Sequence, residues 1–360
     1  MARGKAKVHD TDDDTLVADI NADMKKKLGD KCDVHVLGDG GFAAQATEWM
    51  PTGLTLLDAG LGGGIPIGRI VEVFGQEVSG KSLLITSMIA SAQKAGAITA
   101  LVDTEHAYTK EYVEKLTGAD THKIHYMDPE HLEDMWQACF DFIAIVRKKT
   151  DRPILLCIDS LAGMPTREEI EKDMDDASSI ATAARCNKRA LRKMTRELAM
   201  NRAVLVMTNQ EIAKINALPW GEKTTTSGGG GPKYFSSVRL RMDHMGYLVE
   251  DKMRVGQKVQ IVEYKTRFAG SGRKFECPIL FASGFDDLGC CVNYLAQKGQ
   301  LGTKKGYVSW GGEEYRTKDL KARLSTNAEE RGQLQALAVQ TYSCSGLEDE
   351  ELGAETVAGE

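Results

Sequence analysis

The chain has 360 residues, of which 42% are hydrophobic and 27% are charged, which excludes a fibrous or wholly disordered chain and allows about two domains. No stretch approaches the roughly 18 consecutive apolar residues of a membrane span, and the N-terminus lacks the apolar core of a secretory signal. We therefore expect a cytoplasmic protein with no membrane partner. The eight cysteines show no metal-ligand spacing, so we interpret them as small buried residues in a reducing compartment.

The formal net charge of −6 argues at first sight against a nucleic-acid-binding protein. The charge is unevenly placed, however, because residues 348–360 contain six acidic side chains and no basic one. Without this tail, 46 acidic residues remain against 46 basic ones. A balanced body can carry a local basic groove, so composition leaves DNA or RNA binding open.

Residues 1–50 are predicted to form a separate N-terminal element, with a helix at 16–28 and a strand and turn within VHVLGDGGF. The middle of the chain then alternates short apolar runs with amphipathic patterns. Strands are predicted at 69–74, 98–103, 153–159 and 203–208, and helices at 82–94, 132–148 and 181–200. This alternation is typical of a parallel sheet buried on both faces.

Three later runs, SSVRLRMDH, KVQIVEYKTRF and KFECPILFA, have no long helix between them and predict antiparallel strands added to the sheet. A helix within VNYLAQKG, a hairpin within YVSWGGEEY and further helical segments predict a small C-terminal α+β domain with Trp310 in its core. The expected fold class is therefore α/β with a mostly parallel sheet. Its expected parts are residues 1–50, 51–286, 287–346 and a disordered acidic tail at 347–360.

The strongest motif is GQEVSGKS, which has the phosphate-loop pattern G-x-x-x-x-G-K-[ST] directly between a predicted strand and a predicted helix. Its glycines let backbone N–H groups point at phosphate oxygens, and the helix N-terminus adds positive potential. Lys81 is expected to contact the outer phosphates and the Ser82 hydroxyl to bind Mg²⁺. The predicted nucleotide-binding residues are Gly75, Gln76, Glu77, Val78, Ser79, Gly80, Lys81 and Ser82.

Polar side chains follow three other predicted strands. Asp159 ends the run ILLCID and is a candidate metal ligand, the alternative being a cap for the next turn. Glu105 follows ITALVD and is a candidate for activating the attacking water, whereas His106 is expected to pack or hydrogen-bond locally. Asn209 and Gln210 follow AVLVMT, and their uncharged amides suit the sensing of a phosphate.

Several blocks in the same order resemble the RecA-type homologous-recombination proteins of bacteria and their phages: TGLTLLDAGLGGGIPIGRIVEVFGQEVSGKS, LVDTEHAYTKEYVEKL, ILLCIDSLAG, VMTNQ and TTTSGGGGPKYFSSVRLRM. The resemblance runs from about Asp19 into the C-terminal domain. It implies a RecA-like ATPase core and an ATP-dependent DNA recombinase that forms helical filaments on single-stranded DNA. It also implies homologous pairing and strand exchange with duplex DNA, in recombination and DNA repair.

By position, the resemblance implies that Glu105 is the catalytic carboxylate, Asp159 acts at the metal, and Tyr112 stacks on adenine. Gln210 matches the γ-phosphate switch. Residues 171–179 and 211–231 match the first and second DNA-binding loops, and the N-terminal element matches an oligomerisation element. Lys265 and Arg267 lie near basic positions that reach ATP across the subunit interface. The implied cofactors are ATP and Mg²⁺, and the implied partners are further copies of the chain, a single-strand binding protein and a loader.

Four arginines of the predicted helix 181–200, Arg185, Arg189, Arg192 and Arg196, share one face. They predict either a DNA-binding stripe or a solvated face, and family positions favour DNA contact for Arg185 and Arg192. Lys233 and Tyr234 are candidates for a phosphate and a base contact, although Tyr234 and Phe235 could equally begin the next strand.

The second loop departs from the usual form because it is longer in glycine, and Pro219 and Trp220 come earlier in it. Two other functions stay open on the same core fold: a ring-forming motor or clock-type ATPase, and a filament-forming binding protein whose ATPase acts only as a release switch. The short N-terminal element better suits docking on a neighbour in an open filament.

Overall fold

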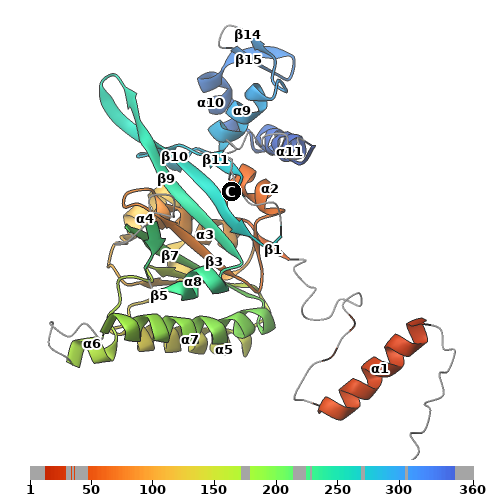
Figure 1. The fold of residues 1–360 in the computed structure, drawn as a ribbon. Helices are drawn as coiled ribbons and strands as arrows, with labels where there is room; N and C mark the ends of the chain where they lie inside the picture. The colour runs from red at the N-terminus through yellow and green to blue at the C-terminus, as the bar shows by residue number, and fades with distance from the viewer. Residues whose placement is uncertain are drawn as a thin grey trace, which may run out of the picture. The chain divides into compact units, whose positions relative to one another are not determined.

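The computed structural model describes residues 13–29, 34, 36, 48–171, 179–213, 224–227, 229–268, 272–304 and 307–344 (Figure 1). The chain divides into two units, residues 1–48 and 49–360. Helix α1 (Asp13–Leu28) lies in the first unit and confirms the predicted helix. Most of the strand and turn predicted at 34–42, and the acidic tail, lie outside the described residues.

A large mixed sheet forms the core of the second unit, in the order β13-β12-β10-β9-β3-β7-β6-β4-β5. Its neighbouring strands are parallel from β9 to β5. These strands are β3 (Ile70–Gly75), β4 (Ile98–Asp103), β5 (Ile124–Met127), β6 (Ile154–Asp159), β7 (Ala203–Ala213) and β9 (Val238–Glu250). The predicted α/β class with a mostly parallel sheet is therefore confirmed.

The other edge of the sheet is antiparallel. It contains β10 (Met253–Thr266), β11 (Lys274–Glu276), β12 (Ile279–Leu280) and β13 (Gly284–Phe285). Figure 1 shows the long β9–β10 hairpin extending beyond the sheet. The prediction that the three late runs form antiparallel strands is confirmed for β9 with β10, whereas β9 joins the rest of the sheet parallel to β3, which was not predicted. A strand that is parallel to β3 must begin at the same end of the sheet as β3 does. The short helix α8 (Gly230–Phe235) comes directly before β9 in this connection.

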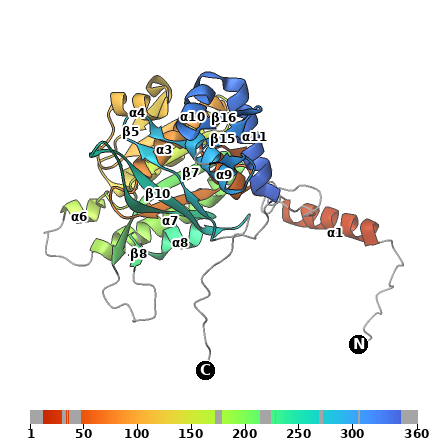
Figure 2. The same cartoon turned by 90° about the horizontal axis from the view of Figure 1, so that it is seen from above.

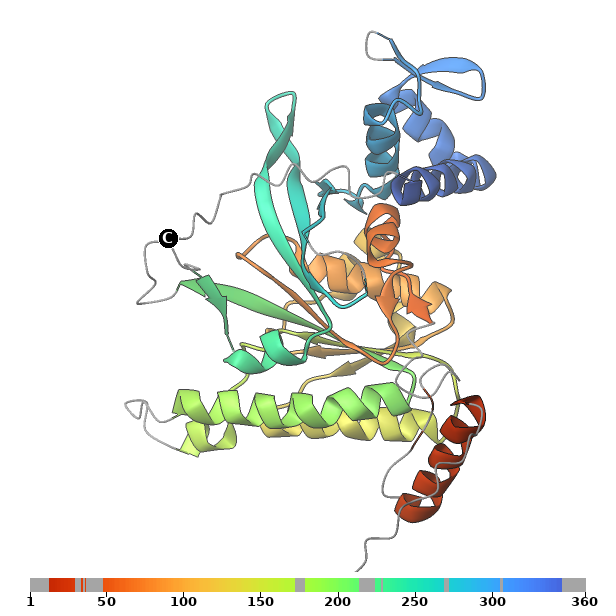
Figure 3. The ribbon, with the colours of Figure 1, turned by 45° about the vertical axis from the view of Figure 1, so that its right-hand side comes forward.

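Helices cover both faces of the sheet (Figure 3). On one face, α3 (Lys81–Lys94) packs on side chains such as Leu155 and Cys157. On the other face, α5 (Leu132–Arg147) and α7 (Ser179–Met200) pack on alternate side chains such as Leu156 and Ile158. Because neighbouring strand residues face opposite sides, an uninterrupted apolar run supplies both cores.

The long helices and central strands begin and end close to the predicted positions. An exception is β7, which continues to Ala213 because β8 (Thr224–Thr226) pairs with its extension. Several short elements were not predicted, since they are too brief to show a clear period: β1 (Trp49–Met50), α2 (Thr55–Leu61), β2 (Ile65–Pro66), α4 (Lys110–Thr117), the 3₁₀ turn Thr121–Lys123, β5 and α6 (Arg167–Glu171).

The C-terminal part has its own apolar cluster, with Leu295, Leu320 and Leu334 at its centre. It is built from α9 (Asp287–Gln297), β14 (Thr303–Lys304), β15 (Tyr307–Trp310), β16 (Glu313–Arg316), α10 (Thr317–Thr326) and α11 (Ala328–Cys344). Trp310 packs against this cluster, as predicted. In the part of the chain that the structure describes, no helix is both long and apolar enough to span a membrane.

Candidate functional site

The loop between β3 and α3 requires glycine at both ends. Gly75 has φ 152° and Gly80 has φ 92°. A Cβ atom at Gly75 would clash with the Met242 carbonyl of β9, and one at Gly80 would clash with the Ile279 side chain of β12. The Gln257 amide of β10 donates to the Val78 carbonyl at 3.1 Å. Strands β9, β10 and β12 therefore pack directly against the backbone of the phosphate loop.

The start of α3 is open to an anion. Its N-cap is Gly80, and no described side chain caps its first N–H groups. Lys81 Nζ donates to the carbonyls of Gly75 at 3.2 Å and Gln76 at 2.7 Å. Burial lowers the Lys81 pKa, and the carboxylates of Asp159 and Glu105 act against that shift. The ammonium therefore lies among acids at a helix N-terminus, where phosphate oxygens could replace the two carbonyls as acceptors.

Asp159 and Asp103 end adjacent strands in register, β6 and β4. Asp159 is 4% exposed, and its two carboxylate oxygens accept hydrogen bonds from the hydroxyls of Tyr108 and Thr208. Burial and the nearby charge of Asp159 raise the Tyr108 pKa, so the phenol keeps its proton and donates it. Both carboxylate oxygens of Asp159 are thus held by hydroxyl groups, and its charge acts on Lys81 of the phosphate loop.

Tyr108 was not recognised from the sequence. The signal for it is an aromatic hydroxyl in the loop after β4, a few residues beyond Glu105, at the edge where the ligands of parallel sheets bind. A hydrogen bond with Ser82 opposes the rise of the Tyr108 pKa, so the phenol interacts with both candidate Mg²⁺ ligands, Ser82 and Asp159.

Asp103 shapes the loop that carries Glu105. Its buried carboxylate accepts the backbone N–H of Glu105 at 3.1 Å, the backbone N–H of Tyr108 at 3.4 Å and the hydroxyl of Tyr126 at 3.0 Å. Glu105 itself is exposed, and its Oε1 accepts from Ser160 Oγ at 2.7 Å. Glu105 is therefore held by Asp103 at the end of β4 and by Ser160 just after β6, while its carboxylate stays accessible to water.

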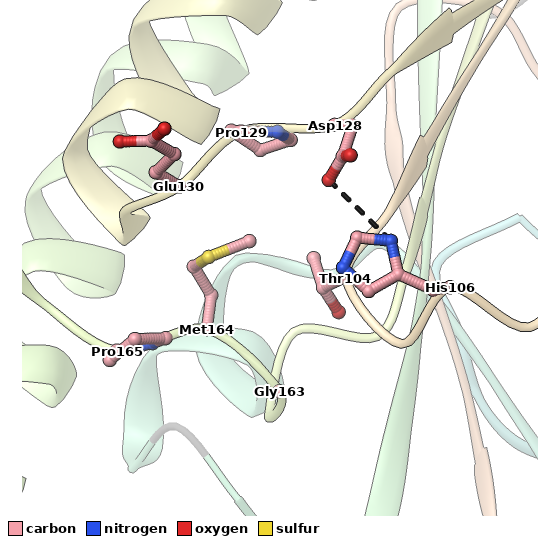
Figure 4. Close-up of a pocket in the computed structure, with 8 residues that line it drawn as sticks. All are labelled: Thr104, His106, Asp128, Pro129, Glu130, Gly163, Met164 and Pro165. Atoms are coloured by element: carbon pink, nitrogen blue, oxygen red, sulfur yellow. Dashed lines mark ion pairs between the residues drawn. The ribbon is translucent and has the colours of Figure 1, made fainter.

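A pocket of about 430 Å³ lies at the ends of β4, β5 and β6 (Figure 4). In it, His106 Nδ1 lies 3.7 Å from Asp128 Oδ1, which is longer than a hydrogen bond, and both side chains are exposed. The pocket is lined by Thr104, His106, Asp128, Pro129, Glu130, Gly163, Met164 and Pro165, and so does not include the phosphate loop.

The described residues contain no cluster of three or more His, Cys, Asp or Glu side chains that could hold a metal ion alone. Ser82 and Asp159 offer oxygen donors beside the phosphate loop, and hard oxygen donors are what Mg²⁺ prefers. Because Mg²⁺ usually binds through one or two protein oxygens together with substrate phosphates, the donor set fits a metal that arrives with a nucleotide.

Gln210 lies on β7 directly opposite Gly75 of the phosphate loop. Asn209, predicted with it as a phosphate sensor, faces the other side of the sheet and hydrogen-bonds Glu72. Of the two amides, only Gln210 lies toward the nucleotide side. Residues 172–178, 214–223 and 228, which cover most of both predicted DNA loops, lie outside the described residues.

Three predicted nucleotide-contacting residues lie on separate elements. Tyr112 is in the first turn of α4 and is 44% exposed, and partial burial raises its pKa. Arg267 is exposed just beyond the end of β10. Lys265 Nζ donates to the carbonyls of Ser236 at 2.7 Å and Lys233 at 3.0 Å, which stabilises the C-terminus of α8. In the single chain, the Lys265 ammonium is thus bound to backbone carbonyls at the end of α8.

The arginine stripe lies on the outer face of α7, since Leu191, Met194 and Leu198 are buried on its inner face. All four arginines of the stripe are exposed: Arg185, Arg189, Arg192 and Arg196. Helix α8 lies beside α7 (Figure 2), where a Cβ at Gly231 would be 3.3 Å from Lys188 Cα. Lys233 and Tyr234 lie in α8, and Tyr234 is 70% exposed. The alternative that Tyr234 and Phe235 begin the next strand is wrong, because β9 begins at Val238.

Residues 16–286 match the RecA N-terminal domain family, which covers the N-terminal helix, the phosphate loop and the whole central sheet. The chain belongs to the RecA family. It is 33% identical to Protein RecA of Mycobacteroides abscessus over 294 residues, which is 81% of this chain and 82% of the relative. It is also 33% identical to Protein RecA of Acinetobacter baylyi over 290 residues, 80% of each chain. Protein RecA of Gloeobacter violaceus is 32% identical over 266 residues, 74% of this chain and 70% of the relative.

This RecA-family chain is therefore a RecA-type recombinase with a role in recombination and DNA repair. The family match ends at residue 286, and α9 begins the C-terminal apolar cluster at Asp287. The division into four domains proposed from the sequence stays a prediction.

Proposed function

We propose that this RecA-family chain is a DNA-dependent ATPase that hydrolyses ATP to ADP and phosphate with Mg²⁺. We propose further that it forms helical filaments on single-stranded DNA and exchanges strands with homologous duplex DNA. The observation that carries the proposal is that the phosphate loop, Asp159 and Gln210 meet at the carboxyl edge of one parallel sheet. Ligands of open parallel sheets bind at this edge.

In this proposal, Lys81 exchanges its two loop carbonyls for the outer phosphates, and Tyr112 stacks on the adenine. Ser82 and Asp159 would hold Mg²⁺, which neutralises charge on the phosphates when bound. Glu105, steadied by the Ser160 hydroxyl at 2.7 Å, accepts the proton of the attacking water.

The DNA side of the proposal uses exposed cations. Arg185 and Arg192 of α7 and Lys233 of α8 contact phosphates, and Tyr234 stacks on a base. Arg267 and Lys265 approach the nucleotide of a neighbouring copy, and Lys265 would first have to leave the carbonyls at the end of α8. The proposed compartment is the cytoplasm, where a single-strand binding protein and a loader would be further partners.

The deciding experiment measures phosphate release from ATP and Mg²⁺ with and without single-stranded DNA, and images the same samples by electron microscopy. Open helical filaments and DNA-stimulated hydrolysis are expected. Closed rings would instead favour the motor or clock-type alternative. Filaments that form and dissociate without hydrolysis-coupled strand exchange would favour a binding protein with a release switch.

A further inference from the structure

A buried ion pair lies on the strand that leads into the phosphate loop. Glu72 of β3 is 0% exposed and Arg239 of β9 is 4% exposed, and they are direct cross-strand neighbours. Arg239 Nε donates to Glu72 Oε2 at 2.5 Å. The guanidinium also lies 4.4 Å from the Phe74 ring centre and 5.2 Å from that of Tyr264. The pair is therefore fixed on several sides.

The second carboxylate oxygen of Glu72 is used by Asn209. Asn209 Nδ2 donates to Glu72 Oε1 at 2.9 Å and to the Ser227 carbonyl at 2.9 Å. Asn209 Oδ1 accepts the backbone N–H of Gln210 at 2.9 Å and the Ser227 hydroxyl at 2.6 Å. Its amide has two donor hydrogens and two lone pairs, so these four bonds use its full capacity.

The position of Asn209 connects the two faces of the sheet. Along β7, Val206 packs on the α3 face and Met207 packs on the α5–α7 face. By this alternation Asn209 faces α7 and α8, whereas Gln210 faces the phosphate loop opposite Gly75. A movement of Gln210 on the nucleotide side therefore acts on the neighbouring Asn209 on the proposed DNA side.

Ser227 closes the other end of the segment that begins after Gln210. Between them, Glu211 pairs with Thr226 and Ala213 with Thr224, and the Ser227 N–H donates to the Gln210 carbonyl at 3.3 Å. Both ends of residues 211–226 are thus tied to one amide, and that amide is tied to a buried carboxylate of β3.

We propose that Asn209 is a positioning residue that couples nucleotide to DNA. The Glu72–Arg239 pair fixes its side chain, which fixes Gln210 and Ser227 together, so that displacement of Gln210 by the γ-phosphate moves Ser227 and the paired ends of β7 and β8 with it. The inference rests on the proposed ATP-dependent DNA binding. Without this link, Gln210 could shift without carrying Ser227 with it.

The measured quantity is the coupling ratio, meaning the affinity for a labelled single-stranded oligonucleotide with a non-hydrolysable ATP analogue and Mg²⁺, divided by the affinity without nucleotide. Ser227→Ala removes one hydrogen bond to Asn209 and should lower the ratio about threefold to tenfold. Ser325→Ala is the matched control, because Ser325 bonds only to its own helix turn at Ala322 among the contacts seen for it. The control should keep the wild-type ratio.

Asn209→Asp gives a signature that a merely structural role would not produce. The introduced carboxyl would lie about 3 Å from Glu72 and share one proton with it, which raises the pKa of the pair. At about pH 6 the shared proton restores the bond to Glu72, and at about pH 8 the two carboxylates repel each other. Arg239 and Lys265 are the cations that act on Glu72, and both are unchanged in this variant. We expect a ratio near one at about pH 8 that recovers to within about threefold of wild type at about pH 6.

Asn187→Asp is the matched control for placing a carboxyl at a buried asparagine. Asn187 is 2% exposed and accepts from Trp136 Nε1 at 2.9 Å, away from this network. Its ratio should follow wild type at both pH values. Binding of a fluorescent ATP analogue should be unchanged in all variants, because none of the exchanged groups lies on the phosphate-loop face.

The outcomes separate the inference from the proposed function. A wild-type ratio of one would overturn ATP-dependent DNA binding itself. A wild-type ratio well above one, with Ser227→Ala unchanged or with Asn209→Asp equally impaired at both pH values, would overturn only the positioning role of Asn209. Loss of nucleotide affinity in Asn209→Asp would do the same, because it would make Asn209 part of the nucleotide site.

Discussion

Glu263 allows a sharp test of the structure through its pH dependence. Its side chain on β10 is 0% exposed, and neither carboxylate oxygen has a hydrogen-bond partner among the described atoms. The nearest cation is Arg273, whose Nη1 lies 3.9 Å from Oε2 and donates to the Gly60 carbonyl at 2.6 Å. Burial raises the Glu263 pKa from 4.5 to about 7, and Arg273 only partly opposes the shift.

The sign and size of the effect follow from linkage. The folded protein holds the Glu263 proton at pH values where the unfolded chain has released it, so this group favours folding at low pH and loses that contribution as pH rises through about 7. At about 1.4 kcal/mol for each pH unit, the interval from 4.5 to about 7 corresponds to about 3 kcal/mol. Between about pH 5.5 and about pH 8 the expected loss of unfolding free energy from Glu263 is about 2 kcal/mol.

Glu263→Gln removes this titration. Urea denaturation of wild type and variant at about pH 5.5 and about pH 8 should show the variant gaining about 2 kcal/mol relative to wild type at the higher pH, whatever constant offset the amide introduces. Burial also raises the pKa of Asp58 to about 7. Its contribution is the same in wild type and variant, so it cancels when the unfolding free energy of one is subtracted from that of the other. Glu276→Gln, at an exposed position of β11, controls for the change of charge. An offset that is the same at both pH values would refute the buried, unpartnered carboxylate.

Four further predictions concern the proposed ATPase and DNA-binding activities. Lys81→Ala should abolish tight ATP binding and strand exchange because the loop loses its mobile cation, and normal turnover would refute the nucleotide assignment. Glu105→Gln should keep ATP binding and DNA filaments while phosphate release slows by about 10²-fold or more, whereas an equal loss of nucleotide affinity would make Glu105 structural. Gln210→Ala should keep ATP affinity but lose most of the ATP-induced gain in DNA affinity, measured with and without nucleotide. Deleting residues 348–360 should strengthen duplex binding at low Mg²⁺ and less so at high Mg²⁺, because the acidic tail competes with DNA phosphate and Mg²⁺ screens it. Equal duplex binding by full-length and truncated protein at both Mg²⁺ levels would leave the tail only a solubility role.

Much of the central fold was predictable because its signals are local. Uninterrupted apolar runs placed β4 and β6, and the spacing of polar and apolar side chains placed α3, α5 and α7. The direction of β9 was not predictable in this way. Strand direction depends on the path of the connection, and here a six-residue helix, α8, brings the chain back to the starting edge of the sheet.

The phosphate loop was predictable from its own residues, since glycines, lysine and serine at fixed spacing carry the chemistry. The groups that hold it in place come from distant parts of the chain. Tyr108 and Asp159 are 51 residues apart, and Asn209 and Glu72 are 137 residues apart. No local pattern encodes such pairs, so they became visible only when the strands were placed side by side.

The buried Glu72–Arg239 pair is better explained by positioning than by stability. Burying two charges costs desolvation that their attraction often does not recover, and an apolar pair of similar volume is frequently as stable. An apolar pair, however, could not accept the hydrogen bond of Asn209. If Gln210 and Ser227 must keep one geometry relative to each other, a carboxylate fixed by Arg239 supplies the directional contact that apolar packing lacks. On this view, the polar residues on the α7 side of β3 and β9 belong to the same functional unit as the phosphate loop on the other side of the sheet.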